Sequence, residues 1–486
     1  MISTRYAIKL FIICTILTTI TNFPSGFTNS SVNTAVEELK RFLNESYESR
    51  GWSLDETGYS FIRSTTLNCW FVSQVFGAIV APILTDHYGR KIAYVISALV
   101  MLLAALTQFI ATLTSLPELL IAGRALCALC SPLSDAALIL YLQECSPLEM
   151  RGAFSFLGEI GYGSMCVLGM VLGMRSVLGY SLPKLLGVSI IPQLFFVIFL
   201  LFLPETPKFL MIIRNDRAGA LKSLEFFQGE NKENERILDE YMREANEEGD
   251  SKRSSLREIL CTWHLRQAVI LSCMVLVLTL SFYPILQSST YFFTQAQVPS
   301  EIAEISSTTM MVVFTIACIT GTLFIDRFPR RILIFIFGSL SYFFLLMFVL
   351  CSAFGYLVWW IKYVSLGFMA SYIVSFGMVL GPMSWFLGPE LVPQRHRSSL
   401  FCLCYGINNI LITITNFSTI PLYQHIGAYT FLPLFIVPSV CALIYLYLYL
   451  PETRGRETHA IVASMRRKKL KDVESCSDFT PDLTKL

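Results

Sequence analysis

Two short stretches, each present twice, decide the architecture of this chain. Asp86-His-Tyr-Gly-Arg-Lys91 follows one apolar run, and Asp326-Arg-Phe-Pro-Arg-Arg331 follows another, 240 residues later (86 to 326). The second stretch, Pro204-Glu-Thr-Pro-Lys208, recurs 247 residues later (204 to 451) as Pro451-Glu-Thr-Arg-Gly455. Signatures that recur in order at nearly constant spacing indicate an internal repeat, so we expect two equivalent halves.

A third pair of charges completes the repeat. Glu144 precedes Arg151 by seven residues, as Glu390 precedes Arg397. If these charges lie at helix ends on one side of a membrane, they can form inter-helix salt bridges when that side closes, each exposed pair contributing ~0.2–1 kcal/mol. The alternative is that they only follow topology rules and anchor helix ends. The candidate gate residues are Asp86, Arg90, Glu144, Arg151, Glu205, Asp326, Arg331, Glu390, Arg397 and Glu452.

The composition is that of a polytopic membrane protein. Only 15% of the 486 residues are charged and 54% are hydrophobic, whereas soluble domains have roughly 25% charged residues. Lys+Arg (37) and Asp+Glu (35) nearly cancel, so the chain carries no nucleic-acid signal. We expect twelve membrane-spanning helices, because about 17–25 apolar residues span a bilayer. They lie near 7–27, 63–85, 92–113, 117–143, 152–173, 184–203, 268–293, 303–325, 332–353, 357–388, 398–421 and 428–450.

The expected fold is all-α, with two six-helix bundles in a parallel repeat. We expect an N-terminal bundle at 1–203, a charged linker of short helices at 204–264, a C-terminal bundle at 265–452 and a polar tail at 453–486.

Basic residues concentrate in alternate short connections, which predicts that the linker and both termini are cytoplasmic. The sequon at Asn44 then lies outside and is the candidate N-glycosylation site, whereas the sequons at Asn29 and Asn416 fall at or inside spans. We also expect the basic cluster 466–471 to contact the inner leaflet or to act as a topology anchor.

These motifs resemble the sugar-porter branch of the major facilitator superfamily, and in particular the animal facilitative glucose transporters. The resemblance rests on Asp86–Lys91, on Glu144-Cys-Ser-Pro-Leu-Glu-Met-Arg-Gly152 and on Pro204–Lys208, and it covers essentially residues 8–460. It implies twelve helices and alternating access. It also implies a solute site that includes Trp385, which follows Gly381-Pro382 on helix 10, and Asn408 on helix 11.

The chain departs from that family where the family binds sugar. The Gln-Gln-Leu-Ser-Gly-x-Asn run of helix 7 corresponds here to Val277-Leu-Thr-Leu-Ser-Phe-Tyr283, so both glutamines and the asparagine are missing. Phe314 occupies the place of an asparagine, Gly377 that of a glutamate, and Asn409 that of a tryptophan. Pro329 replaces a glycine of the second loop signature, so we expect that turn to differ in shape.

The helix-7 region still offers polar side chains around Pro284. Pro284 either breaks the helix against the solute site or makes a plain kink, and Trp385 either stacks on a sugar or is a packing residue. The candidate substrate-binding residues are Glu159, Tyr283, Gln287, Ser288, Trp385, Asn408 and Asn409.

Glu159 takes the place of the family's sugar-contacting glutamine on helix 5. Proton-coupled relatives use a helix-1 acid near a helix-4 arginine; here the corresponding residues are Thr28 and Arg124, which favours a uniporter. Glu159 either pairs with Arg124, as a structural or coupling pair, or faces the solute.

We expect a secondary transporter of a hexose or related small polar solute, acting by facilitated diffusion at the plasma membrane. Two alternatives remain: an organic-ion, organic-acid or proton-coupled carrier of the same fold, and a non-transporting nutrient sensor. The five histidines lie at loops or helix ends, and no catalytic constellation is present. We therefore expect no enzyme activity, cofactor or metal, and as partners only a small solute and the lipid bilayer. The oligomeric state does not follow from the sequence.

Overall fold

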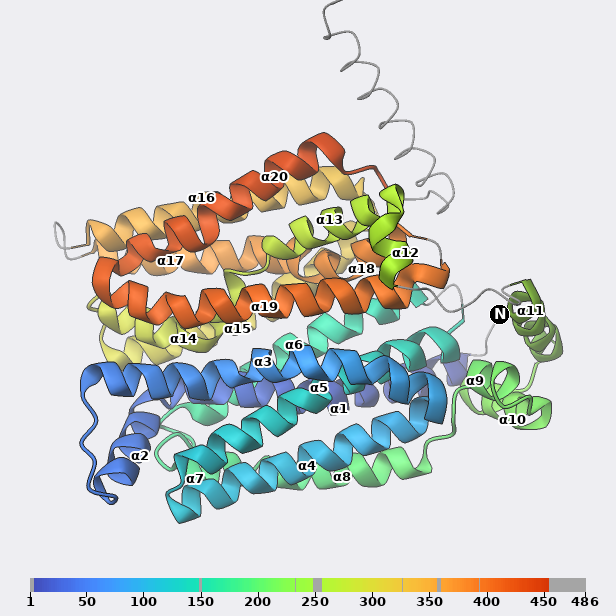
Figure 1. Ribbon diagram of the computed structural model, residues 1–486, viewed down its shortest axis with the longest axis horizontal. Helices are drawn as coiled ribbons and strands as arrows, with labels where there is room; N and C mark the ends of the chain where they lie inside the picture. Colours follow the sequence, from blue (N-terminus) through green and yellow to red (C-terminus); the bar gives the residue numbers. More distant parts are fainter. Residues whose placement is uncertain are drawn as a thin grey trace, which may run out of the picture.

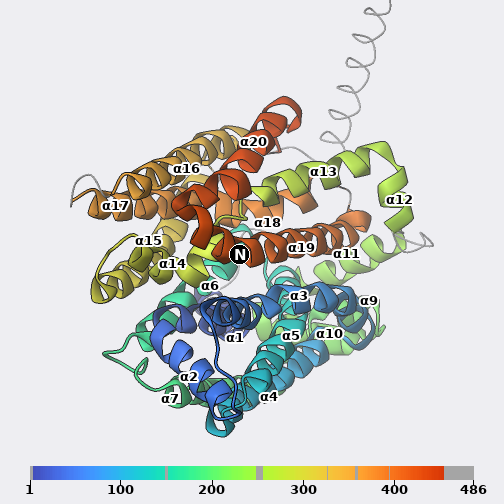
Figure 2. The same cartoon turned by 60° about the vertical axis from the view of Figure 1, so that its left-hand side comes forward.

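The computed structural model describes residues 4–147, 151–231, 233–247, 256–325, 327–355, 360–392 and 394–453, and in these ranges it consists of helices and their connections. The helices form two bundles that lie one above the other when viewed obliquely to the bundle axes (Figure 2).

The first bundle is built from α1 to α8. Its helices are α1 Thr4–Thr34, α2 Val36–Glu48, α3 Glu56–Tyr88, α4 Arg90–Thr114, α5 Pro117–Cys145, α6 Arg151–Gly173, α7 Leu182–Gly187 and α8 Ile190–Phe202. Long helices pack against each other here, α1 on α6 and α5 on both α3 and α4.

Four short helices follow, α9 Pro207–Ile212, α10 Arg217–Gln228, α11 Glu233–Glu247 and α12 Leu256–Cys261. Helices α9 to α11 stand outside the bundles at one end, and α2 stands at the other (Figure 1). The first residues of α1 lie beside this linker, because Lys9 Nζ donates a hydrogen bond to the carbonyl of Phe226 on α10 at 2.7 Å.

The second bundle is built from α13 to α20. Its helices are α13 Trp263–Val277, α14 Phe282–Gln295, α15 Ser300–Ile325, α16 Arg330–Ala353, α17 Ile361–Ser375, α18 Gly381–Glu390, α19 Gln394–Ile426 and α20 Val437–Tyr449. A π-helical turn, Phe376–Leu380, joins α17 to α18. A 3-10 turn, Gly427–Thr430, and a π-helical turn, Leu432–Ile436, precede α20.

Each of the twelve expected spans is mainly helical where the structure describes it. Within the described residues, ten stretches are long and apolar enough to cross a membrane, and a shorter apolar stretch, Leu157–Gly173, lies in α6. The remaining expected span corresponds to α19. The multi-pass expectation is thereby confirmed.

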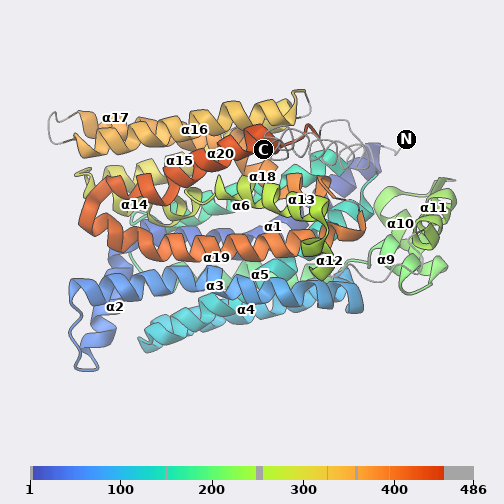
Figure 3. The same cartoon turned by 45° about the horizontal axis from the view of Figure 1, so that its top comes forward.

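In the described part of the chain, the two bundles meet mainly along three pairs of helices. Helix α3 lies beside α19, α6 beside α15 and α1 beside α14, and Figure 3 shows α3 and α19 running side by side. Each pair joins one helix of the first bundle to one of the second. The solute site expected from the sequence therefore has to be sought along these three seams.

Candidate functional site

The repeated glutamates cap the same helix in each bundle. The carboxylate of Glu205 accepts hydrogen bonds from the backbone N–H of Lys91 at 3.0 and 3.1 Å, at the start of α4. The carboxylate of Glu452 accepts from the backbone N–H groups of Arg330 and Arg331 at 3.0 and 3.1 Å, at the start of α16. The first N–H groups of a helix lack partners and carry partial positive charge, so a carboxylate stabilises them. This is the physical role of the repeated Pro-Glu-Thr motif.

The repeated basic residues bind the other end of a neighbouring helix. Lys91 Nζ donates to the carbonyl of Leu201 at 2.9 Å, near the end of α8. Arg331 Nη2 donates to the carbonyl of Tyr447 at 2.5 Å, near the end of α20. Carbonyls in the last turn of a helix also lack partners and attract cations. Each acid–base pair of the repeat therefore fastens two helices of its own bundle together.

The turns before these helices differ as expected. Gly89 has φ +102°, and a Cβ at this position would lie 2.4 Å from Glu205 Oε2 and 2.8 Å from Phe209. Only glycine therefore fits between the capping glutamate and the α4 terminus. The corresponding residue, Pro329, has φ −58° and ψ 129°. The prediction that the second turn has another shape is confirmed.

Arg90 and Glu144 form a largely buried ion pair. Arg90 Nη2 lies 2.9 Å from Glu144 Oε1, and the two side chains are 13% and 7% exposed. Thr206 Oγ1 donates to the other carboxylate oxygen at 2.5 Å. Burial raises the pKa of the neighbouring Glu205, against the opposing effects of its backbone hydrogen bonds and of the Arg90 charge.

These contacts show the partners of three predicted gate acids. Glu144 forms a salt bridge with Arg90 of a neighbouring helix, whereas Glu205 and Glu452 accept hydrogen bonds from the backbone N–H groups that begin α4 and α16. The other predicted gate residues lie outside the described side chains. These are Asp86, Arg151, Asp326, Glu390 and Arg397. Inter-helix salt bridges through these residues, formed when that side closes, stay a prediction.

The helix that contains Pro284 is discontinuous. Helix α13 ends at Val277 and α14 begins at Phe282, with a further non-helical residue at Ser288 (φ −142°). A backbone carbonyl freed by the break, that of Leu278, accepts a hydrogen bond from the Tyr342 hydroxyl at 2.7 Å. The helix break is therefore confirmed, and a partner from a neighbouring helix satisfies it, as is required inside a bilayer. That the break faces the solute site stays a prediction.

Aromatic rings fill the second bundle beside this break. Phe282 stacks on Phe376 with ring centroids 4.8 Å apart, and Phe314 lies 5.0 Å from Phe282. A Cβ on Gly377 would lie 2.9 Å from the Phe314 ring. Phe314 thus occupies the space that a larger residue at 377 would need, which explains why the two departures from the family pattern occur together.

The first bundle contributes carboxylates at the same seam. Glu159 on α6 is partly exposed, and a Cβ on Gly381 of α18 would lie 3.3 Å from its Oε1. Glu159 therefore reaches across to the second bundle. Asp135 on α5, which the sequence analysis missed, accepts from Ser131 Oγ at 3.4 Å. Both carboxylates lie within electrostatic range of Tyr283. Asp135 could have been found from the sequence, because an aspartate inside an otherwise apolar membrane helix usually has a function.

Arg124 does not pair with Glu159. Its Nε donates to the carbonyl of Thr66 at 2.7 Å and its Nη1 to the carbonyl of Thr28 at 2.7 Å. The guanidinium therefore joins α1, α3 and α5 inside the first bundle, whereas Glu159 reaches the other bundle. The proposed coupling pair is not formed, because the two side chains point to different interfaces. Among the described residues, neither Asp135 nor Glu159 is part of an ion pair.

The predicted amides differ in how they are bonded. Asn409 Nδ2 donates to the carbonyl of Tyr405 on its own helix at 3.0 Å. Asn408 is 1% exposed, and neither its Oδ1 nor its Nδ2 has a partner in the described structure. Gln287 Oε1 accepts from Asn416 Nδ2 at 3.5 Å, while Gln287 Nε2 has no partner. Ser288 is buried at the helix break. Asn408 and Gln287 are therefore the predicted residues with unused hydrogen-bonding capacity.

Trp385 is a packing residue in this structure. Its ring lies 5.5 Å from that of Tyr405 and 6.3 Å from that of Phe401 on α19. With Ser272 and Cys404 it lines a small crevice inside the second bundle. The contacts of Trp385 therefore agree with the alternative that it is a packing residue.

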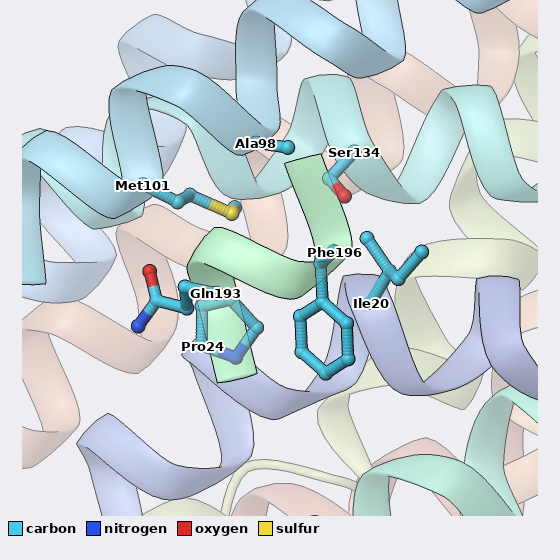
Figure 4. A pocket seen from close by; sticks show the side chains of 7 residues that line it. All are labelled: Ile20, Pro24, Ala98, Met101, Ser134, Gln193 and Phe196. Carbon is cyan, nitrogen blue, oxygen red and sulfur yellow. The ribbon is translucent and has the colours of Figure 1, made fainter. Parts of the chain in front are cut away.

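A small cavity lies inside the first bundle, away from the seam between bundles. Ile20, Met101, Ser134, Gln193 and Phe196 surround it together with Pro24 and Ala98 (Figure 4). Its volume of about 10 Å³ is the space of one water molecule. Gln193 Oε1 has no protein partner there, which suits a single water. The cavity is too small for a sugar.

The chain matches the family described as "Sugar (and other) transporter" over residues 13–463. It belongs to that family. Among similar proteins is solute carrier family 2, facilitated glucose transporter member 9 of Mus musculus, 27% identical over 93% of this chain and 84% of the relative. Member 7 of the same solute carrier family, also from Mus musculus, is 24% identical over 95% and 92%.

Solved structures show the same fold. The proton:xylose symporter XylE bound to 6-bromo-6-deoxy-D-glucose superposes with a TM-score of 0.74 at 17% identity, covering 93% of this chain and 98% of the other. The inward open conformation of XylE from E. coli gives a TM-score of 0.73 at 17% identity, over 93% and 99%.

Membership of the sugar transporter family confirms three predictions. The chain is a sugar porter of the major facilitator fold, it is a membrane transporter, and it is not an enzyme. Where the structure describes the chain, no three His, Cys, Asp or Glu side chains are grouped as metal ligands would be.

Proposed function

We propose that this sugar transporter carries a hexose or a related polyol by alternating access, through facilitated diffusion. The observation that carries the proposal is Asn408, whose side chain is 1% exposed and whose two polar amide atoms have no partner among the described residues. An unpaired buried polar atom costs ~1–3 kcal/mol, and a sugar hydroxyl, which both donates and accepts, can satisfy either atom. The names of the relatives, facilitated glucose transporters, support the same class of solute.

The uniport part of the proposal rests on Arg124. Both of its described hydrogen bonds go to backbone carbonyls, one of them to Thr28. Among the described residues no carboxylate forms an ion pair with Arg124, so no acid there has its proton binding controlled by the guanidinium charge. A solute gradient is then sufficient to drive net movement.

The topology is also a proposal. We infer that the linker helices α9 to α11 and the start of α1 face the cytoplasm of a plasma-membrane protein, because basic residues gather in the connections on that side. Asn44 on α2 then lies outside. Its sequon partner Ser46 is buried and donates to the carbonyl of Phe42 at 2.6 Å, so a glycan would have to be added before α2 packs.

A second candidate function is supported by Asp135 and Glu159. Two carboxylates near Tyr283, with no ion-pair partner in the described part of the chain, suit a solute that carries a protonated amine. The charged form of a carboxylate within a membrane-spanning helix is costly unless a cation compensates it. This candidate is an organic-cation carrier of the same fold.

Uptake into proteoliposomes separates the two candidates. Purified protein is tested with labelled D-glucose and D-glucosamine at about pH 6, where an amine with a pKa of about 8 is protonated. The main proposal expects saturable glucose uptake that Glu159→Gln leaves intact or increases. The cation candidate expects a preference for glucosamine that Glu159→Gln abolishes. Glu301→Gln, an exposed carboxylate on α15, is the matched control. Binding without uptake of either solute would favour a sensor.

A further inference from the structure

A second polar cluster joins α1, α14 and α19, and of its members only Gln287 was predicted to bind solute. Asn33 Nδ2 donates to the carbonyl of Leu286 at 2.9 Å and to Ser289 Oγ at 3.0 Å. Asn416 Nδ2 donates to Gln287 Oε1 at 3.5 Å. We call Asn33, Gln287, Ser289 and Asn416 the outer cluster. It links one helix of the first bundle to two helices of the second.

The outer cluster lies far from the linker. Lys9 is beside the linker helix α10, and Asn33 follows it by 24 residues on the same helix. At 1.5 Å per residue this separation is about 36 Å. The non-helical Ser288 interrupts α14 at this point, so carbonyls of the interrupted turn, such as that of Leu286, are available to Asn33. The cluster thus closes the end of the molecule that the linker does not cover.

The outer cluster leaves hydrogen-bonding capacity unused. Asn33, Gln287 and Asn416 are 1–3% exposed. Asn33 Oδ1, Gln287 Nε2 and Asn416 Oδ1 each lack a partner among the described residues. Buried polar groups in proteins are almost always paired. A permanent seal would be more stable if these positions were apolar or fully bonded, so the unused atoms point to a ligand present in another state.

The unused atoms indicate what the ligand is. Two are amide oxygens, which repel an anion, and one is an amide nitrogen, which donates. Tyr291, on the same helix as Gln287 and Ser289, has its ring 5.0 Å from the Arg63 guanidinium of α3, and Arg63 Nε lacks a partner among the described residues. A guanidinium disfavours a cation. Hydroxyl groups both donate and accept without charge, so they match this mixture of donors and acceptors.

We propose that the outer cluster is a second solute subsite, for a neutral polyhydroxylated solute that enters or leaves at the end opposite the linker. When that end opens, Asn33 separates from Leu286 and Ser289, and hydroxyls of the solute bond to the amides that are unpaired in the closed state. The inference rests on the proposed function, because it assumes a solute that crosses between the bundles. It differs from the proposal for Asn408, which none of these four side chains contacts through a described hydrogen bond.

The test is the double variant Gln287→Leu/Asn416→Leu, with Ser418→Ala as the matched control. Ser418 lies two residues from Asn416, and its hydroxyl donates to the carbonyl of Ile414 on its own helix. Uptake of D-glucose and mannitol is measured in proteoliposomes, and the melting temperature is measured with and without each solute. We expect the KM of the transported solute to rise about tenfold, as for one lost hydrogen bond. We also expect an unchanged or higher melting temperature without solute, and a smaller rise when solute is added.

The outcomes separate a subsite from a structural contact. An unchanged KM, or a lower melting temperature with the solute-induced rise intact, would overturn the subsite and leave the proposed function standing. If the wild-type protein transports and binds neither D-glucose nor mannitol, the proposed function fails and the subsite falls with it. If the double variant does not fold, the single variant Asn416→Thr keeps a small polar side chain and should still raise the KM, by less than the double variant. An unchanged KM in Asn416→Thr would also overturn the subsite.

Discussion

The two bundles share a framework at the linker end and differ at the seam where they meet. Glu205 caps α4 as Glu452 caps α16, and Lys91 binds the end of α8 as Arg331 binds the end of α20. At the seam the first bundle contributes carboxylates, including Glu159, whereas the second contributes aromatic rings such as Phe282, Phe314 and Phe376.

This difference separates the mechanical parts of the transporter from its selective parts. The contacts that hold a bundle together were duplicated and kept their geometry, because each bundle has to move as one body. We propose that the side chains at the seam meet the solute, so they are free to diverge between the halves. Changes to the framework should therefore affect stability and turnover, and changes at the seam should affect which solute is carried.

The largest effect should come from removing one partner of the buried ion pair. Arg90→Ala leaves the carboxylate of Glu144, which is 7% exposed, with Thr206 as its remaining described partner. We expect a loss of about 3 kcal/mol in the free energy of unfolding, typical of a buried charge left unpaired, and a lower turnover. Thermal unfolding and uptake measure the two effects. A normal melting temperature and full uptake would show that this part of the framework is dispensable.

Overpacking at the seam should lower the free energy of unfolding somewhat less than Arg90→Ala does. Gly377→Ala places a Cβ 2.9 Å from the Phe314 ring, so we expect a loss of ~1–3 kcal/mol. Phe314→Leu in the same chain should recover most of it, because the smaller side chain makes room. The melting temperatures of the two single variants and the double variant form the measurement. Additive losses would mean that the two positions do not share this space.

The two capping glutamates should give matched effects. We expect Glu205→Ala and Glu452→Ala each to lose ~1 kcal/mol, because the first N–H groups of α4 and of α16 then lose their capping partner. If the second repeat copies the first, the two melting temperatures fall by the same amount. A large effect at one glutamate and none at the other would break the equivalence of the bundles at the linker end.

The pH dependence gives a finer test of Glu205. Burial raises its pKa in the folded protein, so the folded state binds the proton more tightly than the unfolded state does. Protonated Glu205 therefore adds to the free energy of unfolding. This contribution is complete below the ordinary carboxyl pKa and is lost as the pH rises through the raised pKa of the folded protein. The melting temperature of the wild-type protein should therefore decrease more over that pH window than that of Glu205→Gln. Parallel pH curves for the two proteins would contradict the expectation.

The smallest effect on stability should come from Asn44→Gln, which tests the topology. Asn44 is partly exposed on α2, so the substitution should change the free energy of unfolding by less than ~0.5 kcal/mol. The protein from animal cells should lose its glycosidase-sensitive shift on a gel. A shift that persists would place a glycan on another sequon and contradict the proposed outer side.

Much of the framework could be predicted from the sequence. The repeated motifs, the twelve helices, the break near Pro284 and the altered turn at Pro329 follow from local residue types, because apolar length, proline and charge act over a few residues. The site was predicted only in part. Asn409 bonds to its own helix and Trp385 packs on α19, whereas Asp135 and Asn416 were not predicted to bind solute. Which face of a helix meets the solute depends on how the helices rotate and cross, and a single sequence does not fix that.

The sequence by itself determined that this chain is a membrane protein of two similar halves with charged helix ends on one side. Hydropathy and the repeat carry that information residue by residue. Only the tertiary structure decided which partner each charge takes. Glu205 could in principle have paired with any basic residue at that end, yet it binds the backbone of α4 because the positive φ of Gly89 brings the start of α4 against it. Arg124 likewise binds carbonyls of α1 and α3, because these helices approach it more closely than α6 brings Glu159.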